Sequence, residues 1–132
     1  MGGMVYELTK EFRFEASHIL PHHDGKCARL HGHSWKLAIC VRGPMLHLGG
    51  PQKGMLVDFA VLKNLAQPII NEYLDHRHLN DSTGIESPTS EALARWLYDK
   101  LRDEMPPGLR DQLYYVRVDE TCTSSCRYGG QP

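Results

Sequence analysis

The chain has 132 residues, of which 41% are hydrophobic and 23% are charged. A chain of this length and composition can build one packed domain, which excludes a protein that is disordered by composition. Lys and Arg number 15 against 16 for Asp and Glu, so the formal net charge of -1 gives no electrostatic argument for a nucleic-acid partner.

Membrane and secretory segments are not expected either. No apolar run approaches the roughly 20 residues of a membrane span. The opening MGGMVYELTK lacks the apolar core of a signal peptide. We expect a single cytoplasmic domain over residues 1–132, in which residues 1–3 are disordered or foreign to the natural chain.

Two strands are predicted in the first third of the chain. Residues 5–16 are rich in Tyr and Phe, and Phe12, Phe14 and Ala16 share one face if the segment is extended. PHHDGKC follows and is typical of a loop. Residues 31–43, HGHSWKLAICVRG, alternate best in the chain. One face of this second strand carries His33, Trp35, Leu37, Ile39 and Val41.

Two helices are predicted next. The first begins near Asp58, a suitable N-cap, and Pro68 should kink it or end its first part. Its apolar stripe consists of Val61, Leu62, Leu65, Ile69 and Tyr73. The second spans residues 87–104, with Ser87 as the cap and Pro88 at the first helical position. Its buried face consists of Leu93, Trp96, Leu97 and Leu101.

The remaining elements complete an α+β pattern. Residues 111–121 predict a third strand and residues 126–128 a short fourth one. The order ββααββ predicts a four-stranded antiparallel sheet with two helices on one face. Because a sheet face bearing Trp, Leu, Ile and Val would not be left in water, we expect the uncovered face to be buried by oligomerisation.

Clustered histidines indicate a metal site. Five of the eight histidines fall between positions 18 and 33. Residues two apart in a strand point to the same side, about 7 Å apart, so His31 and His33 can direct their imidazoles at one ion. A hairpin-like pairing of the first two strands would bring His18 alongside. Three imidazoles can bind Zn²⁺ and leave a fourth position open, as in catalytic sites.

Spacing alone leaves other interpretations open. His31 and His33 also fit surface residues flanking a turn at Gly32, and Cys27 could be a fourth ligand in a closed structural site. His22 and His23 lie in a polar loop, where solvent exposure or a substrate contact is more typical than metal binding.

In a cytosolic chain the four cysteines are expected to be free thiols, catalytic groups or metal ligands rather than disulfides. Cys27 lies in a loop next to Lys26 and Arg29, whose charges favour a reactive thiolate. Cys40 is expected to be packed within its strand. The remaining pair, Cys122 and Cys126, is interpreted as structural.

Two acidic residues are further candidates. Asp75 precedes His76, and a carboxylate beside a histidine is the usual way to hold a proton shuttle in one tautomer, although such a pair can also cap a helix end. Glu120 lies near the end of the third strand. It is either a solvated residue or a bidentate acceptor for a planar pair of N–H groups.

Six segments, found in one order along the chain, resemble a known family. They are FRFEASH, CARLHGH, GMLVDFAVLK, LDHRHLND, SPTSEALARWL and ETCTSSC. Over nearly the whole chain they resemble the 6-pyruvoyl-tetrahydropterin synthase superfamily, and most closely its bacterial branch, the 6-carboxytetrahydropterin synthases of queuosine biosynthesis. Ser17, where many relatives have Ala, is a small-for-small change.

The resemblance implies a fold, an assembly and roles for residues. The fold is the tunnelling fold, in which the sheets of a trimer close a barrel and two trimers stack into a homohexamer. The resemblance gives zinc to His18, His31 and His33, and the catalytic thiolate to Cys27. It makes Asp75 and His76 proton-transfer partners contributed by a neighbouring subunit, and it makes Glu120 the anchor of a pterin ring.

The implied reaction converts 7,8-dihydroneopterin triphosphate to 6-carboxy-5,6,7,8-tetrahydropterin, acetaldehyde and triphosphate. Zinc would act as a Lewis acid, Cys27 as general base and His76 as proton relay. The nearest alternative is a 6-pyruvoyl-tetrahydropterin synthase, which keeps the side chain intact. A distant alternative is a non-catalytic zinc-binding or redox-sensing module. Candidates for phosphate contacts are Arg13, Lys26 and Arg29.

Overall fold

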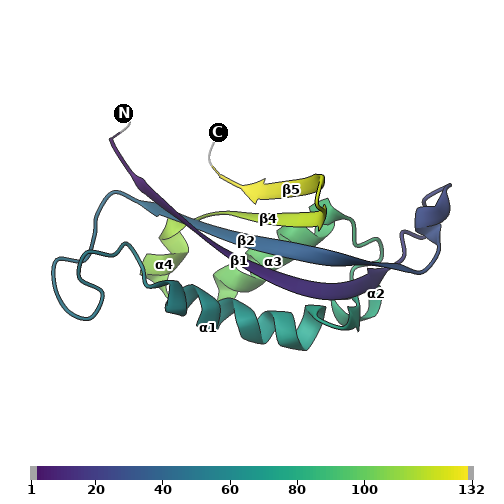
Figure 1. The fold of residues 1–132 in the computed structure, drawn as a ribbon, viewed down its shortest axis with the longest axis horizontal. Helices are drawn as coiled ribbons and strands as arrows, with labels where there is room; N and C mark the ends of the chain where they lie inside the picture. Colours follow the sequence, from purple (N-terminus) through teal and green to yellow (C-terminus); the bar gives the residue numbers. More distant parts are fainter. Residues whose placement is uncertain (1–2, 131–132) are drawn as a thin grey trace.

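The computed structural model describes residues 3–130, and its sheet has five strands. The expectation that residues 1–3 are disordered or foreign to the natural chain lies outside the described residues, apart from Gly3. The strands are β1 (Tyr6–His18), β2 (His31–Gly43), β3 (Arg77–His78), β4 (Leu113–Thr121) and β5 (Ser124–Gly129). Their order across the sheet is β3-β1-β2-β4-β5 (Figure 1).

The predicted four-stranded antiparallel sheet is wrong in one respect. β3 adds a fifth strand that runs parallel to β1, which makes the sheet mixed. A strand of two residues shows no alternation of apolar and polar positions, so its sequence carries no signal for a strand.

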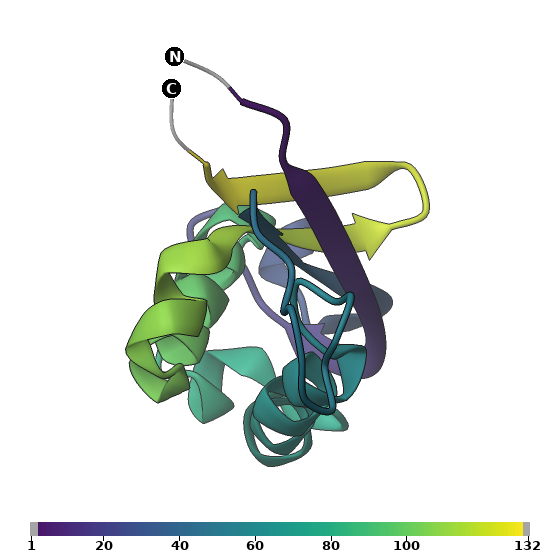
Figure 2. The same ribbon diagram turned by 90° about the vertical axis from the view of Figure 1, so that its left-hand side faces the viewer.

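The helices all lie on one side of the sheet (Figures 1 and 2). They are α1 (Phe59–Ile69), α2 (Leu79–Ser82), α3 (Ser90–Glu104) and α4 (Pro107–Gln112), with a π-helical turn at Ile70–Leu74. A 3-10 turn at Lys26–Ala28 lies apart from them, in the loop between β1 and β2. Two of these helices, α2 and α4, were not predicted because four and six residues are too few for a helical period. No helix within residues 3–130 combines the length and apolar character needed to cross a bilayer.

The structure tests the predicted helix ends. The Asp58 carboxylate accepts a hydrogen bond from the backbone N–H of Ala60 at 2.9 Å, which confirms the first cap. α1 gives way to the π-helical turn one residue after Pro68, as expected for a residue without an N–H. The cap predicted at Ser87 is wrong, because Thr89 accepts from Ala92 N and the helix begins at Ser90.

The two faces of the sheet differ in polarity, and the prediction for them is wrong. Trp35, Leu37, Ile39 and Val41 are buried beneath the helices, as part of the core. The uncovered face carries the alternate residues, among them Glu11, Arg13, Glu15, Lys36 and Arg117. Lys36 Nζ there lies 3.5 Å from a Glu11 oxygen and 3.7 Å from an Asp119 oxygen. An apolar uncovered face therefore gives no argument for oligomerisation.

Candidate active site

The pairing of β1 with β2 creates the histidine cluster. The two strands form an antiparallel ladder in which His18 faces His31, and Ala16 faces His33. His31 and His33 are two residues apart and so project from the same face. The predicted hairpin-like pairing is confirmed, and it places all three imidazoles at one end of the sheet.

The three rings converge on a common point. The ring centroids lie 4.5 Å apart for His18 and His31, 5.0 Å for His31 and His33, and 5.2 Å for His18 and His33. One ring nitrogen from each lies within 4.8 Å of the others. The Trp35 ring lies nearly perpendicular to two of the rings, with its centroid 5.1 Å from that of His18 and 5.3 Å from that of His33. A rigid apolar side chain thus sets the base of the cluster.

Backbone carbonyls orient two of the imidazoles. His18 Nδ1 lies 2.9 Å from Pro88 O, and His31 Nδ1 lies 2.7 Å from Arg29 O. A carbonyl can only accept, so in both contacts Nδ1–H is the donor and the Nε2 lone pair stays free. Holding the outer nitrogen in this way is how proteins fix a ligating histidine in one tautomer.

The Nε2 atoms of His18 and His33, which we call the inner nitrogens of the cluster, have no hydrogen-bond partner among the described residues. His18 Nε2 and His33 Nε2 are buried, and neither makes a hydrogen bond to any atom of residues 3–130. Glu120 oxygens lie 3.9 Å from the first and 3.8 Å from the second, too far for hydrogen bonds. Burial away from water, the largest cause, lowers the pKa of both imidazoles, so both are neutral at neutral pH. Neutral, unpaired nitrogens that converge fit a divalent cation.

Cys27 lies close to this end of the sheet but outside the cluster. It sits half-buried in the 3-10 turn, and its carbonyl accepts a hydrogen bond of 2.9 Å from Leu20 N, just beyond the end of β1. Within the described residues, the close group of possible ligand atoms contains the three imidazoles without the Cys27 thiol. The geometry therefore favours an open three-histidine site over a closed site with a sulfur ligand.

Asp75 and His76 form a pair at the edge of the sheet. His76 Nδ1 lies 3.0 Å from an Asp75 oxygen, and the His76 side chain is 80% exposed. The other Asp75 oxygen accepts a hydrogen bond of 2.9 Å from Glu15 N. This backbone hydrogen bond is the main cause that lowers the pKa of Asp75. An ionised carboxylate thus orients the exposed His76 imidazole.

A shallow groove of about 530 Å³ lies along this edge of the sheet. It is lined by Glu15, Ala16, Ser17, Gly32, His33, Ser34, His76, Arg77 and His78. Glu15, Ser17 and Ser34 belong to the uncovered face of the sheet, so the groove holds His76 on that face, whereas the His33 side chain projects from the other face with Trp35.

Glu120 points toward the cluster from β4. Its side chain is 27% exposed, and Ser90 Oγ lies 3.5 Å from one of its oxygens. A partly exposed carboxylate beside the cluster is placed to accept hydrogen bonds from a ligand that enters there.

Other predicted or overlooked residues fall elsewhere. The exposed His22 side chain pairs with Glu86 at 2.6 Å, and His23 accepts from Gly25 N. No pattern in the sequence pairs Ser17 with His78, whose Oγ and Nδ1 atoms lie 3.0 Å apart in the groove. Only the pairing of β3 with β1 brings these two residues together.

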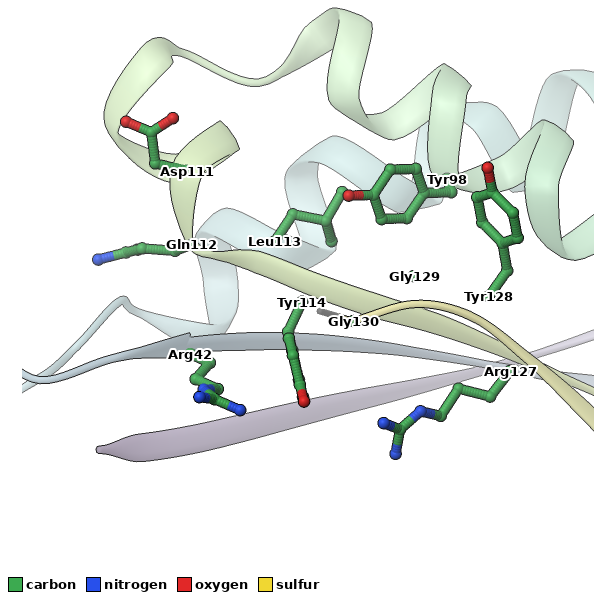
Figure 3. A pocket seen from close by; sticks show the side chains of 10 residues that line it. All are labelled: Arg42, Tyr98, Asp111, Gln112, Leu113, Tyr114, Arg127, Tyr128, Gly129 and Gly130. Carbon is green, nitrogen blue, oxygen red and sulfur yellow. The ribbon is translucent and has the colours of Figure 1, made fainter. Parts of the chain in front are cut away.

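A larger hollow lies at the opposite end of β4 (Figure 3). Its volume is about 760 Å³, and its lining includes Arg42, Tyr98, Tyr114, Arg127 and Tyr128. The Arg42 guanidinium lies 4.3 Å from the centre of the Tyr114 ring, and Arg127 lies 5.5 Å from it on the other side (Figure 3). This hollow contains none of the predicted site residues, so size alone does not locate the reactive groups.

Comparisons with known proteins find relatives that match nearly the whole chain. Residues 7–131 match the family model described as 6-pyruvoyl tetrahydropterin synthase. The chain is 52% identical to the 6-carboxy-5,6,7,8-tetrahydropterin synthase of Synechocystis sp., over 94% of this chain and 93% of that protein. It is 30% identical to the enzyme of the same name from Haemophilus influenzae, over 94% and 99%. The solved structure of Caenorhabditis elegans 6-pyruvoyl tetrahydropterin synthase superposes with a TM-score of 0.81 and 26% identity, over 97% of each chain.

Proposed function

The chain belongs to the 6-pyruvoyl tetrahydropterin synthase family, and from this premise we propose that it is a 6-carboxy-5,6,7,8-tetrahydropterin synthase. The proposed substrate is 7,8-dihydroneopterin triphosphate, and the other products are acetaldehyde and triphosphate. The reaction also consumes one water molecule, so that its substrates and products balance. The observation that carries the proposal is the 52% identity to the Synechocystis enzyme over almost the full length of both chains. We place the reaction in queuosine biosynthesis, in the cytoplasm.

The proposed cofactor is Zn²⁺, held by His18, His31 and His33. The unpaired inner nitrogens of the cluster support this assignment, since neutral imidazoles are typical zinc ligands and three of them leave a position open. When bound, zinc would supply a Lewis acid for the hydroxyl oxygens of the substrate side chain.

Cys27 is the proposed general base. The side chain is half-buried in a turn beside Lys26 and Arg29, and as a thiolate it would remove a proton from carbon on the substrate side chain. His76 exchanges protons with the substrate oxygens, while Asp75 holds its imidazole in one tautomer. Glu120 accepts two N–H groups from the edge of the pterin ring, in the bidentate manner of a carboxylate.

The active sites are proposed to lie between subunits of a homohexamer, built as a dimer of trimers. Two features of the single chain support this. The exposed His76 faces away from the chain's own core. β1 is paired on its outer edge only at Ala16 and Ser17, and β5 has no outer neighbour among residues 3–130. Open strand edges of this kind are suited to pairing with another subunit.

A second activity is supported by part of the same observations. The family model and the C. elegans structure both carry the name of 6-pyruvoyl tetrahydropterin synthase. This activity would use the same groups to eliminate triphosphate and would leave the side-chain carbons joined. The two reactions therefore differ in their products rather than in their sites.

Product analysis tests the proposal. Zinc-loaded protein is incubated with 7,8-dihydroneopterin triphosphate, and the products are identified by mass. Acetaldehyde together with a carboxylated pterin is the expected result. A pyruvoyl side chain would select the second activity, and unchanged substrate would contradict both. Protein stripped of metal by a chelator is the matched control.

A further inference from the structure

The Asp75–His76 pair is attached to the sheet through its shortest strand. β3 has two residues, which pair Arg77 with Ala16 and His78 with Ser17. Immediately before it, the His76 N–H donates to Glu15 O at 2.6 Å. The position of the His76 imidazole therefore depends on how firmly residues 75–78 lie against residues 15–17.

This attachment is under local strain. His76 has a φ of +58°, the only positive value among the non-glycine residues of the described chain. Residues with a Cβ seldom adopt this left-handed conformation, and it persists where the surroundings impose it. A two-residue edge strand offers few backbone hydrogen bonds for that purpose.

A side-chain contact supplies a further link. Ser17 Oγ and His78 Nδ1 lie 3.0 Å apart in a partly buried position, and the two residues face each other in the strand register. Hydroxyl and imidazole can both donate and accept, so the bond forms with either neutral tautomer of His78. Ser34 provides a contrast, because its hydroxyl lies in the same groove but donates to the Glu15 carboxylate at 2.8 and 2.7 Å.

We propose that Ser17 and His78 are positioning residues that hold β3 against β1 and thereby fix the His76 imidazole for proton transfer. The inference rests on the proposed function, because it assigns the two residues a role in the same reaction. Neither residue needs to touch the substrate. Beyond them, the Asn80 side chain makes two separate hydrogen bonds to the backbone of Ile19, at 2.9 and 2.8 Å. The fold should therefore survive the loss of the Ser17 hydroxyl.

Kinetics of the zinc-loaded enzyme provide the first test. Ser17→Ala is expected to lower kcat about 5-fold, the effect of one neutral hydrogen bond, with KM and zinc content unchanged. Ser17→Thr, which keeps the hydroxyl, should restore most of the loss. Ser17→Ala combined with His78→Ala should lose no more than His78→Ala alone, because both changes break the same contact. Ser34→Ala is the matched control and should leave kcat unchanged.

Hydrogen exchange gives a readout that does not need turnover. Loosening β3 should speed the exchange of the His76 amide in Ser17→Ala but not in Ser34→Ala. If the wild-type protein does not convert the substrate, the proposed function fails while this measurement still tests the contact. Unchanged kcat and unchanged exchange in Ser17→Ala would overturn the inference. Additive losses in the double variant would also overturn it, because they would give His78 a role independent of Ser17.

Discussion

The histidine cluster and the Asp75–His76 pair both adjoin the last residues of β1, but they are held in different ways. The cluster is built on the ladder between β1 and β2, which runs from Tyr6 and Gly43 to His18 and His31. The pair is built on the two residues of β3 and a left-handed residue. His18 is fully buried, whereas the His76 side chain is 80% exposed.

This difference suggests that the cluster and the pair have separate roles in the proposed reaction. The cluster lies within one chain, since its three imidazoles, the carbonyls that orient two of them and the Trp35 ring all come from the described residues. The pair exposes the His76 ring, so in the proposed reaction the partners of this ring come from the substrate or from a second subunit. Changes in the cluster should act on metal binding, and changes in the pair on proton transfer alone.

The largest effect is expected from His18→Ala. It removes one of the three proposed zinc ligands from a fully buried position, so the metal should be lost. Turnover should then fall at least about 10⁴-fold, which corresponds to the several kcal/mol that a Lewis acid supplies. Elemental analysis and steady-state kinetics check both effects. The exposed His47 provides the control, His47→Ala, which should keep metal and activity. Full zinc content in the His18 variant would contradict the assignment of this ligand.

Cys27→Ala should separate chemistry from metal binding. Removing a general base costs 10²–10⁴-fold in typical cases, and we expect about 10³-fold with zinc content unchanged. Cys122→Ala, at an exposed thiol of the β4–β5 hairpin, is the matched control. If the Cys27 variant loses its zinc, the thiol is a ligand and the non-catalytic zinc-binding or redox-sensing alternative gains support.

Asp75→Asn should give a smaller loss confined to proton transfer. The amide cannot orient His76 as the carboxylate does, so we expect kcat to fall about 10²-fold while zinc content is unaffected. A second exposed acid–histidine pair, Glu86 with His22, allows a matched control in Glu86→Gln. Equal losses in the two variants would show that the effect is not specific to the pair at β3.

The smallest effect concerns the stability of metal-free protein. Burial lowers the pKa values of His18 and His33 in the folded chain. Below about pH 6.5 these two imidazoles therefore bind protons more readily in the unfolded chain than in the folded chain. The free energy of unfolding should therefore fall as the pH falls below this value, by at most about 1.4 kcal/mol per pH unit for each imidazole. Denaturant titrations at several pH values measure the slope. His33→Gln should flatten it, and a slope of opposite sign would contradict the pKa directions.

Part of this architecture follows directly from the sequence. The alternation in residues 31–43 predicts β2, and a strand places His31 and His33 on one side. Pairing with β1 then brings in His18, and the ladder confirms it. The cap at Asp58 is equally local, because it depends on a side chain and an N–H two residues apart.

Other features depend on contacts that are distant in sequence. β3 and the left-handed His76 exist because residues 75–78 meet residues 15–17, about 60 positions away. The helix cap moves from Ser87 to Thr89, where it leaves the Pro88 carbonyl for His18. Alternation identified the apolar face of β2, but it does not say which face the helices cover. For that reason the argument from an apolar uncovered face to oligomerisation was wrong. The open edges of β1 and β5 are the features that support the proposed assembly.

X-ray absorption at the zinc edge tests the central claim, an open site of three imidazoles beside a free thiol. In zinc-loaded protein we predict nitrogen or oxygen neighbours at about 2.0–2.1 Å, scattering from three imidazole rings and no sulfur shell. A sulfur neighbour at about 2.3 Å, or scattering that accounts for fewer than three imidazoles, would contradict the account.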